Sequence, residues 1–157
     1  MVPTYCVDLK YLLTRFIGMF TVQVFNVLKD VMSFTKYVQV HESEIHGKGI
    51  FTTADIPCGK DIMLIKGEVI SEEECVRRED DENNVYIFWN EINYIDCNNT
   101  DVIKYINHKC DCNCEVDEGD ETSLKLIASR DIKTGEELTI DYGYDEIYEY
   151  CQCQYCL

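Results

Sequence analysis

Three short stretches of the sequence carry the residue types best suited to chemistry. Lys104 to Cys114 reads KYINHKCDCNC and places an Asn-His pair beside three cysteines. Glu137 to Tyr144 reads ELTIDYGY, and the chain ends on the letters CQCQYCL. An amide, an imidazole, tyrosine hydroxyls and thiolates are typical of a site that binds a ligand and a metal. We therefore expect one site assembled from segments that are far apart in the sequence.

The ten cysteines indicate metal binding rather than a disulfide framework. Six of them fall in two tight clusters, which is how thiolate ligands for zinc are usually supplied. The clusters are Cys110, Cys112, Cys114 and Cys151, Cys153, Cys156. The scattered cysteines, expected to be ordinary buried thiols, are Cys6, Cys58, Cys75 and Cys97. The pattern favours a reducing, intracellular compartment.

The composition indicates a single acidic domain. The chain has 157 residues, 46% of them apolar, and a net charge of −16, so it can bury a core. The negative charge argues against a nucleic-acid-binding surface, which would need clustered Lys and Arg. It favours a basic partner, attracted by the long-range field. The plainer interpretation is that most of the acidic side chains only solvate the surface.

Residues 1–37 form a segment whose apolar residues recur near helical spacing. The mostly apolar run from Phe16 to Leu28 is too short for a membrane span, which needs about 20 residues, and no cleavage site for a signal peptide follows it. We expect a helix, or a helix followed by a strand, packed on the domain. Contact with a membrane or a partner is the alternative.

From Val38 onward, short strands separated by turn residues predict a mainly β domain with few helices. Ser71 is a good helix N-cap, and the acidic residues after it predict a short helix that runs to about Arg78. We expect residues 79–84 to form a solvated loop and residues 116–122 to form a polar, acidic hairpin. Strands are predicted at residues 37–41, 62–65, 85–89 (buried), 94–97, 124–128 and 138–142.

Five motifs, met in a fixed order, make the chain from about Val38 to Cys156 resemble the SET-domain lysine methyltransferases. The motifs are Gly47-Lys48-Gly49-Ile50, Gly67-Glu68-Val69-Ile70-Ser71, Tyr86-Ile87-Phe88, Tyr105-Ile106-Asn107-His108-Lys109-Cys110 and Glu137-Leu138-Thr139-Ile140-Asp141-Tyr142. The tail resembles the family's post-SET cysteine region. Any one motif is a weak signal, whereas five in the family's order are specific.

The resemblance implies a mainly β fold of several small sheets, with the segments around Asn107 and Tyr142 crossing in a pseudoknot. It divides the chain into an N-terminal extension (residues 1–37), a SET domain (residues 38–145) and a zinc-binding tail (residues 146–157). The letters GEVISEEECVRRED followed by YIF look most like the branch that methylates lysine 9 of histone H3. The usual cysteine-rich pre-SET region is missing.

The resemblance also assigns roles to individual residues. Tyr142 is implied to be the catalytic tyrosine. The residues implied to bind the methyl donor S-adenosylmethionine are His46, Gly47, Lys48, Gly49, Tyr86, Asn107 and His108. The residues implied to line the channel for the target lysine are Tyr144, Tyr105, Ile140 and Ile65. The implied ligands of a structural zinc are Cys110, Cys151, Cys153 and Cys156, with Cys112 and Cys114 as spare thiols.

Some residues depart from the family's pattern. Lys109 stands where the family has serine and Cys112 where it has proline, and the cysteine tail is shorter than usual. Ile65 and Ile140 stand where aromatic residues are common. Isoleucine offers no hydrogen bond to the amine, so we expect a dry channel that accepts a methylated lysine and carries the reaction past monomethyl-lysine.

The resulting hypothesis is a protein-lysine N-methyltransferase that acts on a basic substrate, a histone H3 tail, in the nucleus at the chromosome. We expect a monomer with neither direct nucleic-acid binding nor a membrane span. The alternative is a catalytically silent SET domain that binds a basic tail or scaffolds a complex. A third hypothesis is a small thiol-zinc interaction module. The intact Asn107, His108 and Tyr142 favour the enzyme.

Overall fold

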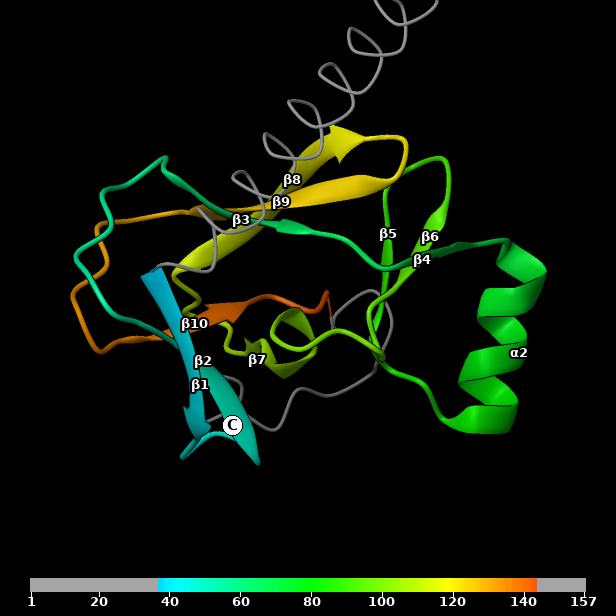
Figure 1. Ribbon diagram of the computed structural model, residues 1–157, viewed down its shortest axis with the longest axis horizontal. Coiled ribbons are helices and arrows are strands. Elements are labelled where there is room, and N and C mark those ends of the chain that lie inside the picture. The colour runs from blue at the N-terminus through cyan, green and yellow to red at the C-terminus, as the bar shows by residue number, and fades with distance from the viewer. Residues whose placement is uncertain (1–36, 144–157) are drawn as a thin grey trace, which may run out of the picture. The chain divides into compact units, whose positions relative to one another are not determined.

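The structure is a computed structural model that describes residues 37–143 (Figure 1). The predicted N-terminal helix, Tyr144 and the cysteines of the tail lie outside these residues. Three small sheets and one α-helix make up the described part of the chain, which confirms the prediction of a mainly β fold. Within this part, no helix has the length and apolar character that crossing a membrane requires.

A four-stranded sheet carries the segments that hold the candidate chemistry. Its strands are β1 (Val38–Glu42), β2 (Lys48–Thr52), β10 (Glu137–Ile140) and β7 (Asn107–His108), in that spatial order. The first two form an antiparallel hairpin, β10 pairs antiparallel with β2, and β7 pairs parallel with β10. The two segments whose crossing the resemblance implies therefore lie side by side.

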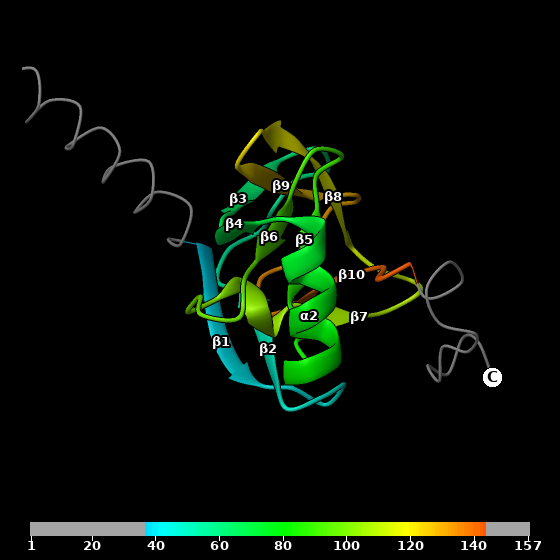
Figure 2. The same ribbon diagram turned by 90° about the vertical axis from the view of Figure 1, so that its right-hand side faces the viewer.

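Two three-stranded sheets complete the β structure. One has the order β3 (Asp61–Ile65), β9 (Ser123–Ala128), β8 (Cys114–Asp120). The other has the order β4 (Glu68–Ile70), β6 (Tyr94–Asp96), β5 (Ile87–Trp89). The helix α2 (Glu72–Glu82) lies beside the second of these sheets (Figure 2), and a 3₁₀ turn, η2 (Ile103–Tyr105), precedes β7. Strands β8 and β9 form an antiparallel hairpin, so the residues predicted to be a whole acidic hairpin, 116–122, are only the end of its first strand and its turn.

The core is built mainly from isoleucine and leucine on the inward faces of these strands. Ile50, Ile65, Ile95, Leu126 and Leu138 are all fully buried, and they belong to one cluster that joins the three sheets. Because successive side chains of a strand point to opposite faces, this packing decides which residues of β2 and β10 point outward.

The helix is longer than the sequence suggests. Ser71 is its N-cap, as predicted, and its hydroxyl accepts a hydrogen bond from the Glu74 N–H. The helix continues to Glu82, so the prediction that it ends near Arg78 and that residues 79–84 form a loop was wrong. Ion pairs along the helix extend past that point, and the chain leaves the helix only at an asparagine in the left-handed region (φ 54°).

The predicted buried strand at residues 85–89 is short and largely exposed. Only Ile87–Trp89 form a strand, and Val85 and Trp89 are 65% and 61% exposed. The reason is that β5 is the edge strand of its sheet, and the Asn84 side chain caps the N–H of Tyr86 before pairing begins. The apolar run therefore correctly predicted a strand here but wrongly predicted that the strand is buried.

The scattered cysteines follow the prediction only in part. Cys75 and Cys97 are buried, and burial raises the pKa of the Cys97 thiol to about 12. Cys58 is exposed, so the expectation that it is a buried thiol was wrong. Its backbone N–H donates to the Asp131 carboxylate, in a turn that runs along the surface.

Arg78 connects α2 to the β4–β6–β5 sheet. Its guanidinium lies 2.5 Å from the Asp96 carboxylate and 2.7 Å from that of Glu68, and it also bonds Glu74 at 2.8 Å. The Asp96 side chain is only 4% exposed. Burial raises the pKa of Asp96, but hydrogen bonds from the Asn98 N–H and Arg78 outweigh it and hold the pKa below its ordinary value.

We predict that Arg78→Met lowers the melting temperature by about 5 °C or more, because it leaves a buried carboxylate without its cation. The matched control is Arg77→Met on the same helix. Arg77 pairs with Glu74 and Glu82, but the pairs are exposed, so we expect a change within about 2 °C. Thermal unfolding by circular dichroism measures both. Equal losses in the two variants would show that Arg78 is no more important than a surface ion pair.

Candidate functional site

The site is centred on the side chain of Asn107, the first residue of β7. This residue is only 7% exposed, and its amide N–H₂ faces four oxygen atoms. These are the backbone oxygens of His46 (3.3 Å) and Lys48 (3.0 Å), the Ser43 hydroxyl (3.2 Å) and the Glu137 carboxylate (2.7 Å). The Ser43 hydroxyl also bonds Glu137 at 2.8 Å. The side-chain amide of Asn107 thus links the β1–β2 turn to β10.

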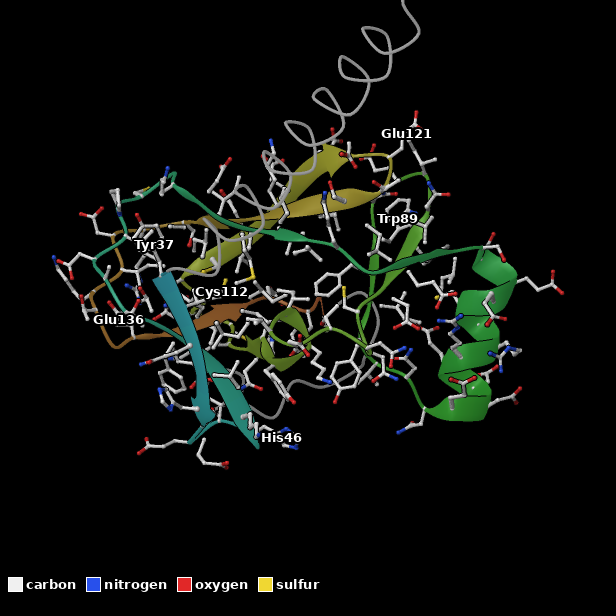
Figure 3. The ribbon with its side chains drawn as sticks, in the orientation of Figure 1. Tyr37, His46, Trp89, Cys112, Glu121 and Glu136 are labelled. Carbon is white, nitrogen blue, oxygen red and sulfur yellow. The ribbon has the colours of Figure 1, made fainter. Side chains whose placement is uncertain are left out.

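The glycines of the Gly-Lys-Gly motif allow this close approach. Gly47 has φ +47°, a conformation that other residues rarely adopt. A Cβ atom on Gly49 would overlap the Glu137 carboxylate. The motif therefore needs glycine at both places, and the turn lies at the tip of the β1–β2 hairpin, where His46 is marked in Figure 3.

His108 follows Asn107 and points its ring toward the end of β10. Its Nδ1 accepts the backbone N–H of Tyr142 at 3.1 Å, and its Nε2 lies 3.3 Å from the Cys110 sulfur. Because Nδ1 accepts a hydrogen bond, the neutral ring carries its hydrogen on Nε2, toward the sulfur. Asp141 lies 3.6 Å from Nδ1. The His108 imidazole therefore holds the backbone N–H of Tyr142, the candidate catalytic tyrosine, in place.

Tyr142 is held by both its backbone and its hydroxyl. The hydroxyl donates to the backbone oxygen of Ile106, the residue before Asn107, and the ring centre lies 5.2 Å from that of His108. The side chain remains 38% exposed. Since the hydroxyl hydrogen is used, the lone pairs of the phenol oxygen and the Ile106 carbonyl are the polar groups offered to a ligand at this edge.

The structure brings together most, but not all, of the predicted cofactor residues. Asn107 contacts the turn at residues 46–49, and Lys48 places its ammonium 5.5 Å from the Tyr105 ring centre, where Lys104 also lies at 5.3 Å. Tyr86 belongs to a different part of the fold, directly before β5, and is 38% exposed.

Of the four residues predicted to line a lysine channel, two are packed inside the core. Ile65 is fully buried and Ile140 is 4% exposed, and both belong to the main apolar cluster. Tyr105 packs against that cluster and is partly buried. Tyr144 lies outside the described residues. Ile65 and Ile140 are apolar, as the hypothesis of a dry channel requires, but they are packed in the core. Tyr105 or other groups would then have to form the walls of the channel.

The cysteines near His108 differ in access to solvent. Cys110 is exposed and Cys112 is half-buried, whereas Cys114 is fully buried and burial raises its pKa to about 12. A metal ligand must be a thiolate, so the surroundings of Cys114 favour an inert core thiol. Within residues 37–143 no group of three metal-binding side chains comes together, and the other predicted ligands, Cys151, Cys153 and Cys156, lie outside that range.

Three further residues, to which the sequence analysis gave no role, hold the site. Asn113 donates to the backbone oxygen of Glu137 and accepts the N–H of Thr139, so it bonds both neighbours of Leu138 on β10. Glu137 and Ser43 form the bonds to Asn107 described above. One signal in the sequence was an asparagine placed among the cysteines of the stretch from Lys104 to Cys114, and it could have marked Asn113.

We predict that Asn107→Asp destabilises the protein in a pH-dependent way. The new carboxylate would face two carbonyl oxygens and Glu137, so burial and repulsion would raise its folded-state pKa. A raised pKa means that stability is retained below the unfolded value of about 4 and is lost as pH rises through the folded-state pKa. Melting temperature against pH measures this, with the exposed Asn99→Asp as the control. Parallel curves for the two variants would contradict the role of the amide.

The sequence and the fold both match known proteins. The family model described as SET domain matches residues 47–143. The H3 lysine-36 specific histone-lysine N-methyltransferase of Schizosaccharomyces pombe is 32% identical over 129 residues, which cover 76% of this chain and 16% of that protein. Histone-lysine N-methyltransferase Set2 of Drosophila melanogaster is 34% identical over 128 residues, covering 75% of this chain and 6% of that protein.

A solved structure gives the same answer for the fold. A humanized mutant of the Chaetomium thermophilum Polycomb Repressive Complex 2, bound to the inhibitor GSK126, superimposes with a TM-score of 0.62 and 33% identity. The match covers 69% of this chain and 15% of that one. This chain therefore spans only a small part of the proteins it matches. Its motifs, its strand arrangement and these matches agree that the chain belongs to the SET domain family.

Proposed function

We propose that the protein is an S-adenosylmethionine-dependent protein-lysine N-methyltransferase that acts on a lysine of a histone H3 tail. The observation that carries the proposal is the pairing of β7 with β10, because it sets Asn107 and His108 beside Tyr142. The relatives named above are histone-lysine N-methyltransferases, and this supports the substrate class.

The residues present fit the methyl donor. When bound, S-adenosylmethionine supplies an electrophilic methyl group on a positively charged sulfur. The phenol oxygen of Tyr142 and the carbonyl oxygen of Ile106 lie together, and such oxygens suit a polarised methyl group through weak C–H···O contacts. His46, Gly47 and Lys48 of the turn are exposed, and Lys48 supplies a positive charge there, as the carboxylate of an amino-acid moiety would require.

The target lysine must lose a proton before it can attack, since its reference pKa is about 10.4. An apolar channel disfavours the charged amine, and the core cluster that contains Ile140 supplies apolar surroundings beside the strand that leads to Tyr142. Tyr142 is held at its backbone and its hydroxyl, so it can fix the position of the reacting atoms. Most of the rate gain would then come from alignment.

The acidic surface is suited to a basic peptide. Residues 79–82 are exposed acidic side chains on α2, beside the sheet whose strand β5 directly follows Tyr86, and the whole chain has a net charge of −16. Such a field steers a cationic tail toward the protein. The relatives support an H3 tail, and we retain lysine 9 as the predicted target with lysine 36 as the alternative. A histone substrate places the action at chromatin in the nucleus, with the enzyme acting as a monomer.

The rival proposal is a SET domain without catalysis that binds a basic tail. The ordered contacts of Asn107, His108 and Tyr142 favour the enzyme, because a binding module would not need the tyrosine hydroxyl held beside a carbonyl oxygen. We propose that residues 38–145 form the catalytic domain, that residues 146–157 form a zinc tail, and that residues 1–37 are an accessory segment.

We predict that Tyr142→Phe lowers turnover by about 10²-fold while the affinity for S-adenosylmethionine changes little, because the lost group acts mainly in the transition state. Transfer of labelled methyl groups to core histones measures turnover, and calorimetry measures cofactor affinity. Tyr37→Phe, at an exposed tyrosine before β1, is the control. Wild-type turnover in Tyr142→Phe would remove the tyrosine from the mechanism.

The same assay decides between the enzyme and its rival. Peptides that carry a single lysine at position 9 or 36 of the H3 tail identify the target, and mass spectrometry after long incubation counts the added methyl groups. We expect dimethyl or trimethyl products. Binding of the H3 peptides without any transfer would favour the silent domain.

We predict about one structural zinc per chain, the number that four thiolates bind in a closed site. Elemental analysis measures it. Cys110→Ser should lose the metal and the activity, whereas Cys58→Ser, at another exposed cysteine, should keep both. Fully active protein that contains no zinc would refute the zinc tail.

A further inference from the structure

A cavity of about 460 Å³ opens on the outer face of the four-stranded sheet. This volume lies within the range of about 300–1,000 Å³ that is typical of ligand-binding pockets. Side chains from the β1–β2 hairpin, from β10 and from the segments near Asp111 and Arg130 line it, and Glu136 at its edge is marked in Figure 3.

The cavity adjoins the candidate site through Glu137, which lines the cavity and bonds Asn107, but it does not include the candidate catalytic tyrosine. Leu138 and Ile140 of β10 point into the core, so the alternate residues Glu137 and Thr139 point to the opposite face, where they line the cavity. Tyr142, by contrast, bonds Ile106 and packs beside His108, and neither belongs to the cavity wall. A ligand in the cavity would therefore contact the back of the sheet that carries the site.

The floor of the cavity offers an unused hydroxyl. Thr139 is 2% exposed, and its hydroxyl makes no hydrogen bond with any residue in the range 37–143. In the same range every fully buried side-chain nitrogen or oxygen has a partner, so the hydroxyl must reach the cavity space. A buried hydroxyl without a protein partner is costly unless a ligand or water bonds it. Thr139 thus marks a place where a polar group is expected to bind.

The charges around the cavity fall into two groups. Glu136 is paired with Arg130 at 2.8 Å, whose hydrogen bond holds the pKa of Glu136 below its ordinary value, and Glu137 is bonded by Asn107. The remaining charged groups of the wall are three exposed or partly exposed carboxylates and one ammonium group, which leaves an excess of negative charge. They are Glu42, Glu44, Asp111 and Lys109.

Apolar groups complete the wall. Phe51, on the outward face of β2, and Ile45, in the turn, both line the cavity. An aromatic ring beside carboxylates suits a cation with an apolar stem: the stem packs on the ring and the charged head bonds the acids. Arginine matches this best, because its flat guanidinium stacks on a ring and bonds a carboxylate through two N–H groups.

We propose that this cavity binds an arginine side chain of a basic peptide segment, with Phe51 against the stem, Glu44 and Asp111 on the guanidinium and Thr139 at the floor. The occupant is a cationic segment of a partner protein rather than a second copy of the chain, because two chains of charge −16 repel each other. Binding of arginine in this cavity needs neither the cofactor nor methyl transfer, so it can be tested independently of the proposed activity.

The test is fluorescence anisotropy of the full chain with a labelled octapeptide of alternating arginine and glycine, at low ionic strength. The matched control peptide carries citrulline in place of arginine, which keeps the shape and removes the charge. We expect binding of the arginine peptide only, with affinity about fivefold weaker in the double variant E44Q/D111N, whose changes remove two rim charges. Thr139→Val should weaken binding by about threefold, as expected for one lost hydrogen bond.

A second double variant, E118Q/E121Q, separates the cavity from the general field. It removes the same charge from the exposed β8–β9 hairpin, and we expect binding within about twofold of wild type. Equal weakening in both double variants would show diffuse attraction and overturn the proposal. Equal binding of the citrulline peptide, or no binding of the arginine peptide, would also overturn it. Melting curves confirm that each variant is folded.

Discussion

The contact between the Asn107 amide and the Glu137 carboxylate is the constraint on which the rest of the site depends. Asn107 is buried and bonds two backbone carbonyls of the turn at residues 46–49, while Glu137 also accepts from Ser43. Three segments that are far apart in the sequence, and that already pair as strands of one sheet, are thereby fixed at one point. The buried amide N–H₂ of Asn107 is tolerated because it donates to these oxygens, among them the partly buried carboxylate of Glu137.

The sequence predicted the members of this site better than the contacts between them. Asn107, His108 and Tyr142 stand in short motifs whose order is specific, so they could be found without a structure. Ser43 and Glu137 are 94 positions apart, and no local pattern reveals that they bond. The predicted lysine-channel residue Ile140 fills the core because the strand's alternation, rather than its composition, decides which way a side chain points.

The same alternation explains where element prediction succeeded. Short strands bounded by turn residues were found at β1, β3, β6 and β9, because apolar residues recur there between glycine and polar residues. The exposure of β5 was missed, since an apolar run says nothing about whether a strand lies at the edge of its sheet. The end of α2 was missed because the ion pair between Arg77 and Glu82 favours a helix over a loop in a run of acidic residues.

The position of β10 in the four-stranded sheet has a consequence for the order of folding. β10 is the last strand of the described part in the sequence, yet it lies between β2 and β7, which precede it by far. While a ribosome is still synthesising the chain, β1 and β2 have only each other, and a lone two-stranded hairpin is marginally stable. Contacts between distant residues are slow to form. The hydrogen bonds that hold the turn at residues 46–49 can therefore form only after nearly the whole domain has left the ribosome.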